Sequence, residues 1–77
     1  MSKKITPVHY KVLVKILKKF GLTIQRITGD HIIMSKPGMK RPAVIQTKSS
    51  IAVPHIINNL KEASITRKEY LNALGRL

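Results

Sequence analysis

The sequence predicts an α+β fold, with helices packed on one face of a small three-stranded antiparallel sheet. Three observations support this class. Between residues 12 and 20 apolar side chains recur every three or four positions, as in a helix, and from residue 22 they alternate with polar ones, as in strands. Helical spacing returns after Pro54. The order helix, three strands, helix and short helix therefore indicates a two-layer domain whose other sheet face is exposed.

The first helix should begin at Thr6-Pro7 and end at Gly21. A threonine hydroxyl can cap a helix, proline is tolerated at the first helical position, and glycine commonly follows the last turn. Lysines occupy one side of this helix, where contact with phosphate groups and simple solvation explain them equally well. The apolar stripe on its other side comprises Val12, Leu13, Ile16, Leu17 and Phe20.

Three strands joined by short turns should follow. In the first strand, alternation places Leu22, Ile24 and Arg26 on one face. Residues 28–30 and 37–38 (Thr-Gly-Asp and Pro-Gly) favour tight turns, which suits an antiparallel meander, and the polar stretch 46–50 is typical of a loop. The strands are expected from Leu22 to Ile27, from His31 to Lys36 and from Pro42 to Gln46.

Two helices should complete the chain. Pro54 suits the first turn of the second helix, and Thr66 and Glu69 have the spacing of a capping box that would open a short third helix before Gly75. No repeat, low-complexity tract or linker interrupts the sequence, so we expect residues 1–77 to form a single domain. The expected apolar faces are Ile56, Ile57, Leu60 and Ala63 in the second helix, and Tyr70, Leu71 and Leu74 in the third.

The charge balance is strongly positive. The chain of 77 residues has 15 Lys and Arg residues against 3 Asp and Glu residues, a formal net charge of +12. Such a charge favours a polyanion such as nucleic acid, or an acidic protein, as the partner. A solvated surface that happens to be basic is the remaining explanation.

The composition also bounds the compartment. The chain contains no cysteine, which excludes disulfides and thiolate metal sites and permits a reducing compartment. No run approaches the roughly 20 apolar residues that cross a bilayer, and the N-terminus lacks the apolar core of a secretory signal. We therefore expect a soluble protein of the cytoplasm.

Three stretches carry a likeness to a known family. They are residues 14–22, which form the predicted helix and its glycine stop, Gly29-Asp30-His31, and residues 60–66, where the second helix ends and a turn follows. In this order and spacing the chain resembles the HicA family, also called YcfA-like proteins. These are small messenger-RNA-cleaving toxins (mRNA interferases) of bacterial and archaeal toxin–antitoxin pairs. The likeness extends over nearly the whole chain.

The resemblance implies a fold similar to the double-stranded-RNA-binding domain and one histidine on the sheet that is essential for ribonuclease activity. Carried over by position, that histidine is His31. It also implies a HicB-like antitoxin that covers this face. The family commonly has a proline and a histidine after the third strand, where this chain has residues 45–48 (Ile-Gln-Thr-Lys), and a glycine where Pro54 stands. These departures concern the contacts with RNA rather than the fold.

The residues themselves are compatible with RNA cleavage. RNA carries its own nucleophile, the 2′-hydroxyl, so an enzyme needs a base for that proton, an acid for the leaving oxygen and cations for the charge on phosphorus. Imidazole has an ordinary pKa of about 6.5, which makes His31 the candidate base or acid. The candidate RNA-binding cations are Lys36, Lys40 and Arg41 around the adjacent turn, and Arg26 on the neighbouring strand.

Other roles for these side chains remain open at this point. Asp30 should not orient His31, because successive strand residues point to opposite faces, and we assign it to the turn. By position alone, His31 is better explained as a histidine with a structural role in the strand than as a catalytic one, and the resemblance reverses that preference. His9 should face solvent. His55 should lie near a helix N-terminus, which disfavours an imidazolium, yet an acid–base pair of His31 and His55 stays open.

No metal cofactor is expected. The three carboxylates are scattered at positions 30, 62 and 69, whereas Mg²⁺ chemistry needs clustered ones, and no histidine pair has zinc-ligand spacing. The leading hypothesis is therefore a metal-independent endoribonuclease. The alternatives are a non-catalytic basic RNA-binding module of similar fold, and a basic protein whose main partner is acidic and whose nuclease activity has lapsed.

Overall fold

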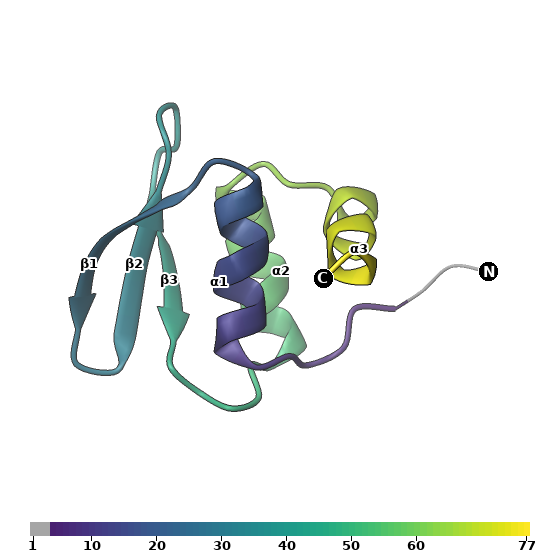
Figure 1. Cartoon of the computed structure of the whole chain (residues 1–77). Coiled ribbons are helices and arrows are strands. Elements are labelled where there is room, and N and C mark those ends of the chain that lie inside the picture. Colours follow the sequence, from purple (N-terminus) through teal and green to yellow (C-terminus); the bar gives the residue numbers. More distant parts are fainter. Residues whose placement is uncertain (1–3) are drawn as a thin grey trace.

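The computed structural model describes residues 4–77 and gives this part of the chain three helices and a three-stranded antiparallel sheet (Figure 1). The predicted class and element order are confirmed. In chain order the elements are α1 (Tyr10–Lys19), β1 (Thr23–Thr28), β2 (His31–Ser35), β3 (Ala43–Gln46), α2 (Val53–Glu62) and α3 (Arg67–Gly75).

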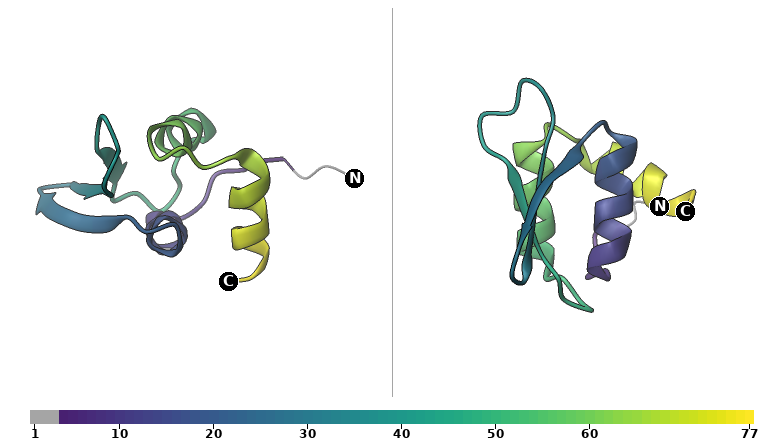
Figure 2. Two further views of the ribbon diagram at one scale, coloured as in Figure 1. Left: turned by 90° about the horizontal axis from the view of Figure 1, so that it is seen from above. Right: turned by 60° about the vertical axis from the view of Figure 1, so that its left-hand side comes forward.

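The elements form layers. The sheet has the strand order β1-β2-β3, and α1 and α2 lie against one of its faces (Figures 1 and 2). The third helix, α3, lies beyond this helical layer and packs on α1, not on the sheet (Figure 2). All three helices are thus on one side, as expected, and no helix of the described chain covers the other face of the sheet.

The register of β2 and β3 decides which side chains face the helices. The pairs Ile32–Ile45 and Met34–Ala43 are buried and belong to the core. The intervening pairs, His31–Gln46 and Ile33–Val44, point to the opposite face because side chains alternate along a strand. We call this second side the uncovered face of the sheet.

The strand β1 departs from the predicted alternation. Ile24 pairs with Met34. Arg26 pairs with Ile33, and the register shifts between these two pairs. Since Met34 and Ile33 point to opposite faces of the sheet, Ile24 and Arg26 do so as well. The expectation that Leu22, Ile24 and Arg26 share a face is therefore wrong, because a bulge adds one residue to β1 and reverses the phase.

The start of α1 also differs from the prediction. The helix begins at Tyr10, not at residues 6–7. The N–H of Ile51 donates a 2.8 Å hydrogen bond to the carbonyl oxygen of Val8, and this isolated β-bridge keeps the preceding segment extended. His9 is the N-cap, since its Nδ1 accepts a hydrogen bond from the backbone of the second helical residue. Because the pairing with Ile51 keeps this segment extended, α1 starts later in the chain than the sequence predicts.

The remaining boundaries differ from the predictions by single residues. β1 begins after Leu22 and includes Thr28, β2 ends before Lys36, and β3 begins after Pro42. Proline lacks the N–H that a ladder position supplies, which explains why β3 starts at the following residue. The third helix includes Gly75 in place of ending before it.

The two C-terminal helices keep most of their predicted features. Pro54 lies in the first turn of α2, and the capping box of Thr66 and Glu69 opens α3 with both hydrogen bonds formed. Ile57 is exposed, so its assignment to the apolar face was wrong. The buried stripe of α2 runs through Ile56 and Leu60, and Ile57 lies beside it, on the solvent side.

The core lies between the sheet and the helices. Its fully buried members come from every element except β1, whose six residues are all exposed. Among residues 4–77, no helix is long and apolar enough to span a membrane. The largest fully buried side chains are those of Tyr70, Leu13, Ile16, Leu17, Leu22, Met34, Ile45 and Ile56.

Candidate active site

An open groove runs along the edge of the sheet, between the uncovered face of β2 and β3 and one side of α2. Its volume is about 490 Å³. We call it the His31 groove. It is lined by His31, Arg41, Pro42, Val44, Gln46, His55, Asn58, Asn59 and Glu62.

The two walls of the His31 groove follow from simple periodicities. On the sheet side, His31 and Gln46 lie directly opposite each other in the antiparallel ladder. On the helix side, the four lining residues of α2 are spaced by three, four and seven positions, which places them on one side of a helix. The other side of α2 is buried in the core, so the helix is held in place and its polar side faces the groove.

The direction of the chain fixes which residues share an end of the groove. β3 ends at Gln46, and α2 begins soon after the connecting loop and runs back in the opposite direction (Figure 1). The beginning of α2, with His55, is therefore nearest to the end of β3, where His31 lies. Arg41 and Glu62 lie at the other end of the groove.

The backbone around His31 is held firmly. His31 is half-buried and opens β2, directly after a tight turn in which Gly29 has a φ of +54°, a value that L side chains rarely adopt. The carbonyl oxygen of Asp30 accepts hydrogen bonds from the N–H of Thr47 at 2.8 Å and from its hydroxyl at 3.2 Å. The turn before β2 is thus tied to the residue that follows β3.

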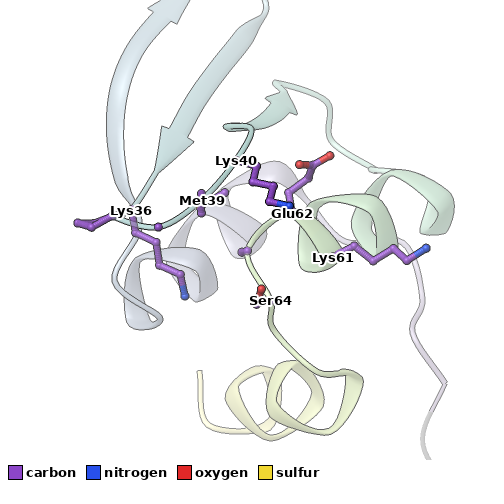
Figure 3. A pocket seen from close by; sticks show the side chains of 9 residues that line it. Lys36, Met39, Lys40, Lys61, Glu62 and Ser64 are labelled. Atoms are coloured by element: carbon purple, nitrogen blue, oxygen red, sulfur yellow. The ribbon is translucent and has the colours of Figure 1, made fainter.

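The four predicted RNA-binding cations are not gathered in one place. Arg41 lines the His31 groove, but at the end away from His31. Arg26 lies on β1, where its partner Ile33 belongs to the uncovered face, and it lines neither the groove nor its neighbour. Lys36 and Lys40 line a second depression (Figure 3).

This second depression, the lysine depression, adjoins the His31 groove. It has a volume of about 390 Å³ and lies between the loop that joins β2 to β3 and the end of α2. Lys36, on the loop side, and Lys61, on α2, both line it, with the Lys61 side chain pointing away from Lys36 (Figure 3). The ammonium group of Lys36 also donates a 3.4 Å hydrogen bond to the carbonyl oxygen of Phe20. Glu62 lines both hollows, so the two are neighbours on one surface.

Several groove residues were missed in the sequence. Gln46, Asn58, Asn59 and Glu62 were not singled out, and His55 entered only as a possible partner of His31. Asn59 is the one polar residue buried among the described residues, with 6% of its surface exposed. The available signal was the polar spacing 55, 58, 59 and 62 within the second helix. That spacing shows a polar side but not what it faces.

The acidic residues do not form a metal site. Among residues 4–77, no three His, Cys, Asp or Glu side chains come together in a way that could hold a metal ion. Asp30 lies in the turn before β2 and does not line the His31 groove. The functional groups that line the groove are two imidazoles, three amides, a guanidinium and the carboxylate of Glu62.

Comparison with known proteins gives one match. The family model described as the HicA toxin of bacterial toxin–antitoxin systems matches residues 10–64. This span runs from α1 to the turn after α2 and includes every residue that lines the His31 groove. No match was found among curated proteins or among solved structures.

Proposed function

The chain belongs to the HicA toxin family, and from this membership we propose that it is an endoribonuclease that cleaves messenger RNA by acid–base chemistry at His31. Membership makes the protein the toxin component of a toxin–antitoxin pair and implies a cognate antitoxin as its partner. The nuclease activity, the RNA substrate and the role of each residue belong to the proposal.

The observation that carries this proposal is the position of His31. Its ring belongs to the uncovered face of the sheet and lines a groove that is open to solvent, where a polynucleotide can reach it. A histidine that only packed would point to the helix side, as Ile32 and Met34 do. Imidazole is also the side chain best suited to move a proton at neutral pH.

The charge of the chain supports a polyanionic substrate. A net charge of +12 attracts RNA from solution and raises the rate of encounter. We assign phosphate contacts along the strand to Arg41 in the groove, Lys36 and Lys40 in the lysine depression, and Arg26 on β1. The adjoining hollows suit a strand that extends from the cleaved bond past Arg41 into the lysine depression.

The proposed reaction uses no metal ion. The 2′-hydroxyl of RNA is the nucleophile, so proton transfer at imidazole and nearby cations are sufficient for chain cleavage. We further propose that a HicB-like antitoxin covers the uncovered face and keeps RNA from His31. The proposed ribonuclease would act in the cytoplasm, where messenger RNA is translated.

A cleavage assay tests the proposal directly. Purified wild-type protein and His31→Ala are each incubated with a labelled single-stranded RNA in EDTA. The control variant is His9→Asn, which changes a histidine outside the groove and keeps a good N-cap for α1. We expect His31→Ala to be slower by about 10²–10⁴-fold, the usual contribution of an acid or base. Cleavage by His31→Ala at the wild-type rate would refute the proposed mechanism. Tight binding of RNA without cleavage by the wild type would instead indicate a non-catalytic RNA-binding module.

A further inference from the structure

The His31 groove contains a second histidine at the same end. We propose that His55 is the second proton-transfer residue of this site and that it acts with His31 as an acid–base pair. This inference rests on the proposed ribonuclease function. It goes beyond that function because it assigns both proton transfers to side chains of this chain.

The fold brings the two side chains to the same groove although 24 positions separate them in sequence. His31 opens β2, its cross-strand partner Gln46 ends β3, and the chain then returns through α2, whose third residue is His55. All three side chains line the groove. Both histidines are accessible, since His31 is half-buried and His55 is exposed.

No other lining residue is placed to take this role. The other charged residues that line the groove are Arg41, which precedes β3, and Glu62, in α2. Glu62 lies seven residues beyond His55, or roughly 10 Å along the helix axis. Arg41 and Glu62 therefore lie at the end of the groove away from the two histidines, and the remaining lining residues are uncharged. Histidine is the side chain that ordinarily changes charge between pH 5 and 8, so these two rings suit acid and base at neutral pH.

The reaction balances with these two groups alone. One imidazole, in its neutral form, takes the proton of the 2′-hydroxyl, and the 2′ oxygen forms a bond to phosphorus. The bond between phosphorus and the 5′ oxygen breaks, and the other imidazole, in its protonated form, gives its proton to that departing oxygen. The products are a 2′,3′-cyclic phosphate and a 5′-hydroxyl end. The two rings have exchanged protonation states and return to their starting states by exchange with water.

A sulfur-substituted RNA separates the two roles. The position of cleavage is first mapped with wild-type protein on a short single-stranded RNA, and the 5′ oxygen of that bond is then replaced by sulfur. Thiols are far more acidic than alcohols, so a thiolate departs without receiving a proton. The variant that lacks the acid should therefore recover on the sulfur RNA, whereas the variant that lacks the base should not.

We expect His31→Ala and His55→Ala each to lose about 10²–10⁴-fold on ordinary RNA. On the sulfur RNA one of the two should cleave nearly as fast as the wild type. The rate of the wild type should rise and then fall with pH, because the base must be neutral and the acid protonated. The rescued variant lacks the acid, so its cleavage rate should no longer decline at alkaline pH. The other variant lacks the base, so its cleavage rate should no longer decline at acidic pH.

Controls keep a structural effect apart from the proposed one. His55→Gln serves as a second variant, circular dichroism checks folding, and binding to the same RNA with 2′-O-methyl groups should match that of the wild type. His9→Asn, outside the groove, should cleave both RNAs at the wild-type rate.

The inference and the proposed function fail in different ways. Full activity of His55→Ala on ordinary RNA, sulfur rescue of neither variant or of both, or an equal loss in His9→Asn would overturn the role of His55. The proposed ribonuclease function would be overturned by a wild type that cleaves neither RNA, or by a fully active His31→Ala.

Discussion

Thr47 holds the carbonyl oxygen of Asp30 with two hydrogen bonds, one from its N–H at 2.8 Å and one from its hydroxyl at 3.2 Å. Asp30 immediately precedes His31, and Thr47 immediately follows the strand partner of His31, Gln46. The contact therefore closes the ladder at the His31 end of the groove. It fixes the backbone that carries His31 without touching the imidazole.

The Thr47→Val variant removes one of these hydrogen bonds and keeps the other. We expect a loss of about 0.5–1 kcal/mol in the free energy of unfolding, measured by urea denaturation, because the hydroxyl contact is exposed and the backbone contact remains. If the proposed catalysis depends on the position of His31, cleavage should slow while the affinity for 2′-O-methyl RNA stays the same, because Thr47 acts only on the backbone that precedes His31. An unchanged rate would show that the hydroxyl bond contributes nothing to positioning.

Expression of the wild-type chain without an antitoxin should arrest bacterial growth, and His31→Ala should relieve the arrest. The reason is that messenger RNA cleavage stops protein synthesis, whereas the variant retains the fold and the charge but lacks the proposed catalytic ring. Growth curves at matched protein levels measure this, with His9→Asn as a variant that should remain toxic. Equal growth of the wild type and His31→Ala would contradict toxicity through this residue.

Binding of uncleavable RNA should depend on salt through the proposed phosphate contacts. Arg41→Ala and Lys40→Ala should each lower the slope of log K against log salt by about 0.7–1, as expected for one lost contact. Lys15 is exposed on α1, in the helical layer on the other side of the sheet. Lys15→Ala should leave the slope unchanged if the lysines of α1 are only solvated. An equal effect of all three variants would indicate that RNA binding is not localised to the groove.

The capping box of α3 predicts a contribution to stability that depends on pH. The N–H of Thr66 donates a 2.9 Å hydrogen bond to the carboxylate of Glu69, and this contact, together with the Thr66 hydroxyl, lowers the pKa of Glu69 from its ordinary value of 4.5. Because the pKa of Glu69 is lower in the folded chain, its carboxylate adds to the free energy of unfolding when the pH is above the ordinary pKa of 4.5. This contribution is lost as the pH falls below about 4.5.

Denaturation of the wild type and Glu69→Gln between pH 3 and pH 7 tests this effect. The variant should be less stable than the wild type at pH 7, and the difference should shrink as the solution becomes acidic, because the carboxylate is then protonated. The contact is solvent-exposed, so the difference should be small. A constant difference across this range would show that the charge of Glu69 is not involved.

Tyr70 provides a test of the core. Its ring is fully buried, its hydroxyl has no hydrogen-bond partner in the described chain, and burial raises its pKa. Leaving a buried hydroxyl unpaired costs free energy, so Tyr70→Phe should be as stable as the wild type or more stable, by up to about 1 kcal/mol. Urea denaturation measures the difference. A clear loss of stability would indicate that the hydroxyl has a partner after all, such as a buried water molecule.

Most of the local structure could be predicted because it depends on neighbouring residues. The period of apolar residues gave the order of helices and strands, and the spacing of Thr66 and Glu69 gave the start of α3. The placement of His31 at the head of a strand also followed from the turn before it. The errors arose where a distant residue intervened. The bridge between Val8 and Ile51 delayed α1, and the bulge in β1 reversed the direction of Arg26.

The sequence by itself determined the α+β class, the strong positive charge and the presence of a single histidine among the strands. Only the tertiary structure decided that α2 lies beside β3, with its polar side next to the uncovered face and His55 in the same groove as His31. The physical reason is that the buried stripe of α2, with Ile56 and Leu60, packs into the core and thereby orients the opposite side of the helix. Periodicity shows which residues share a side, whereas core packing decides what that side faces.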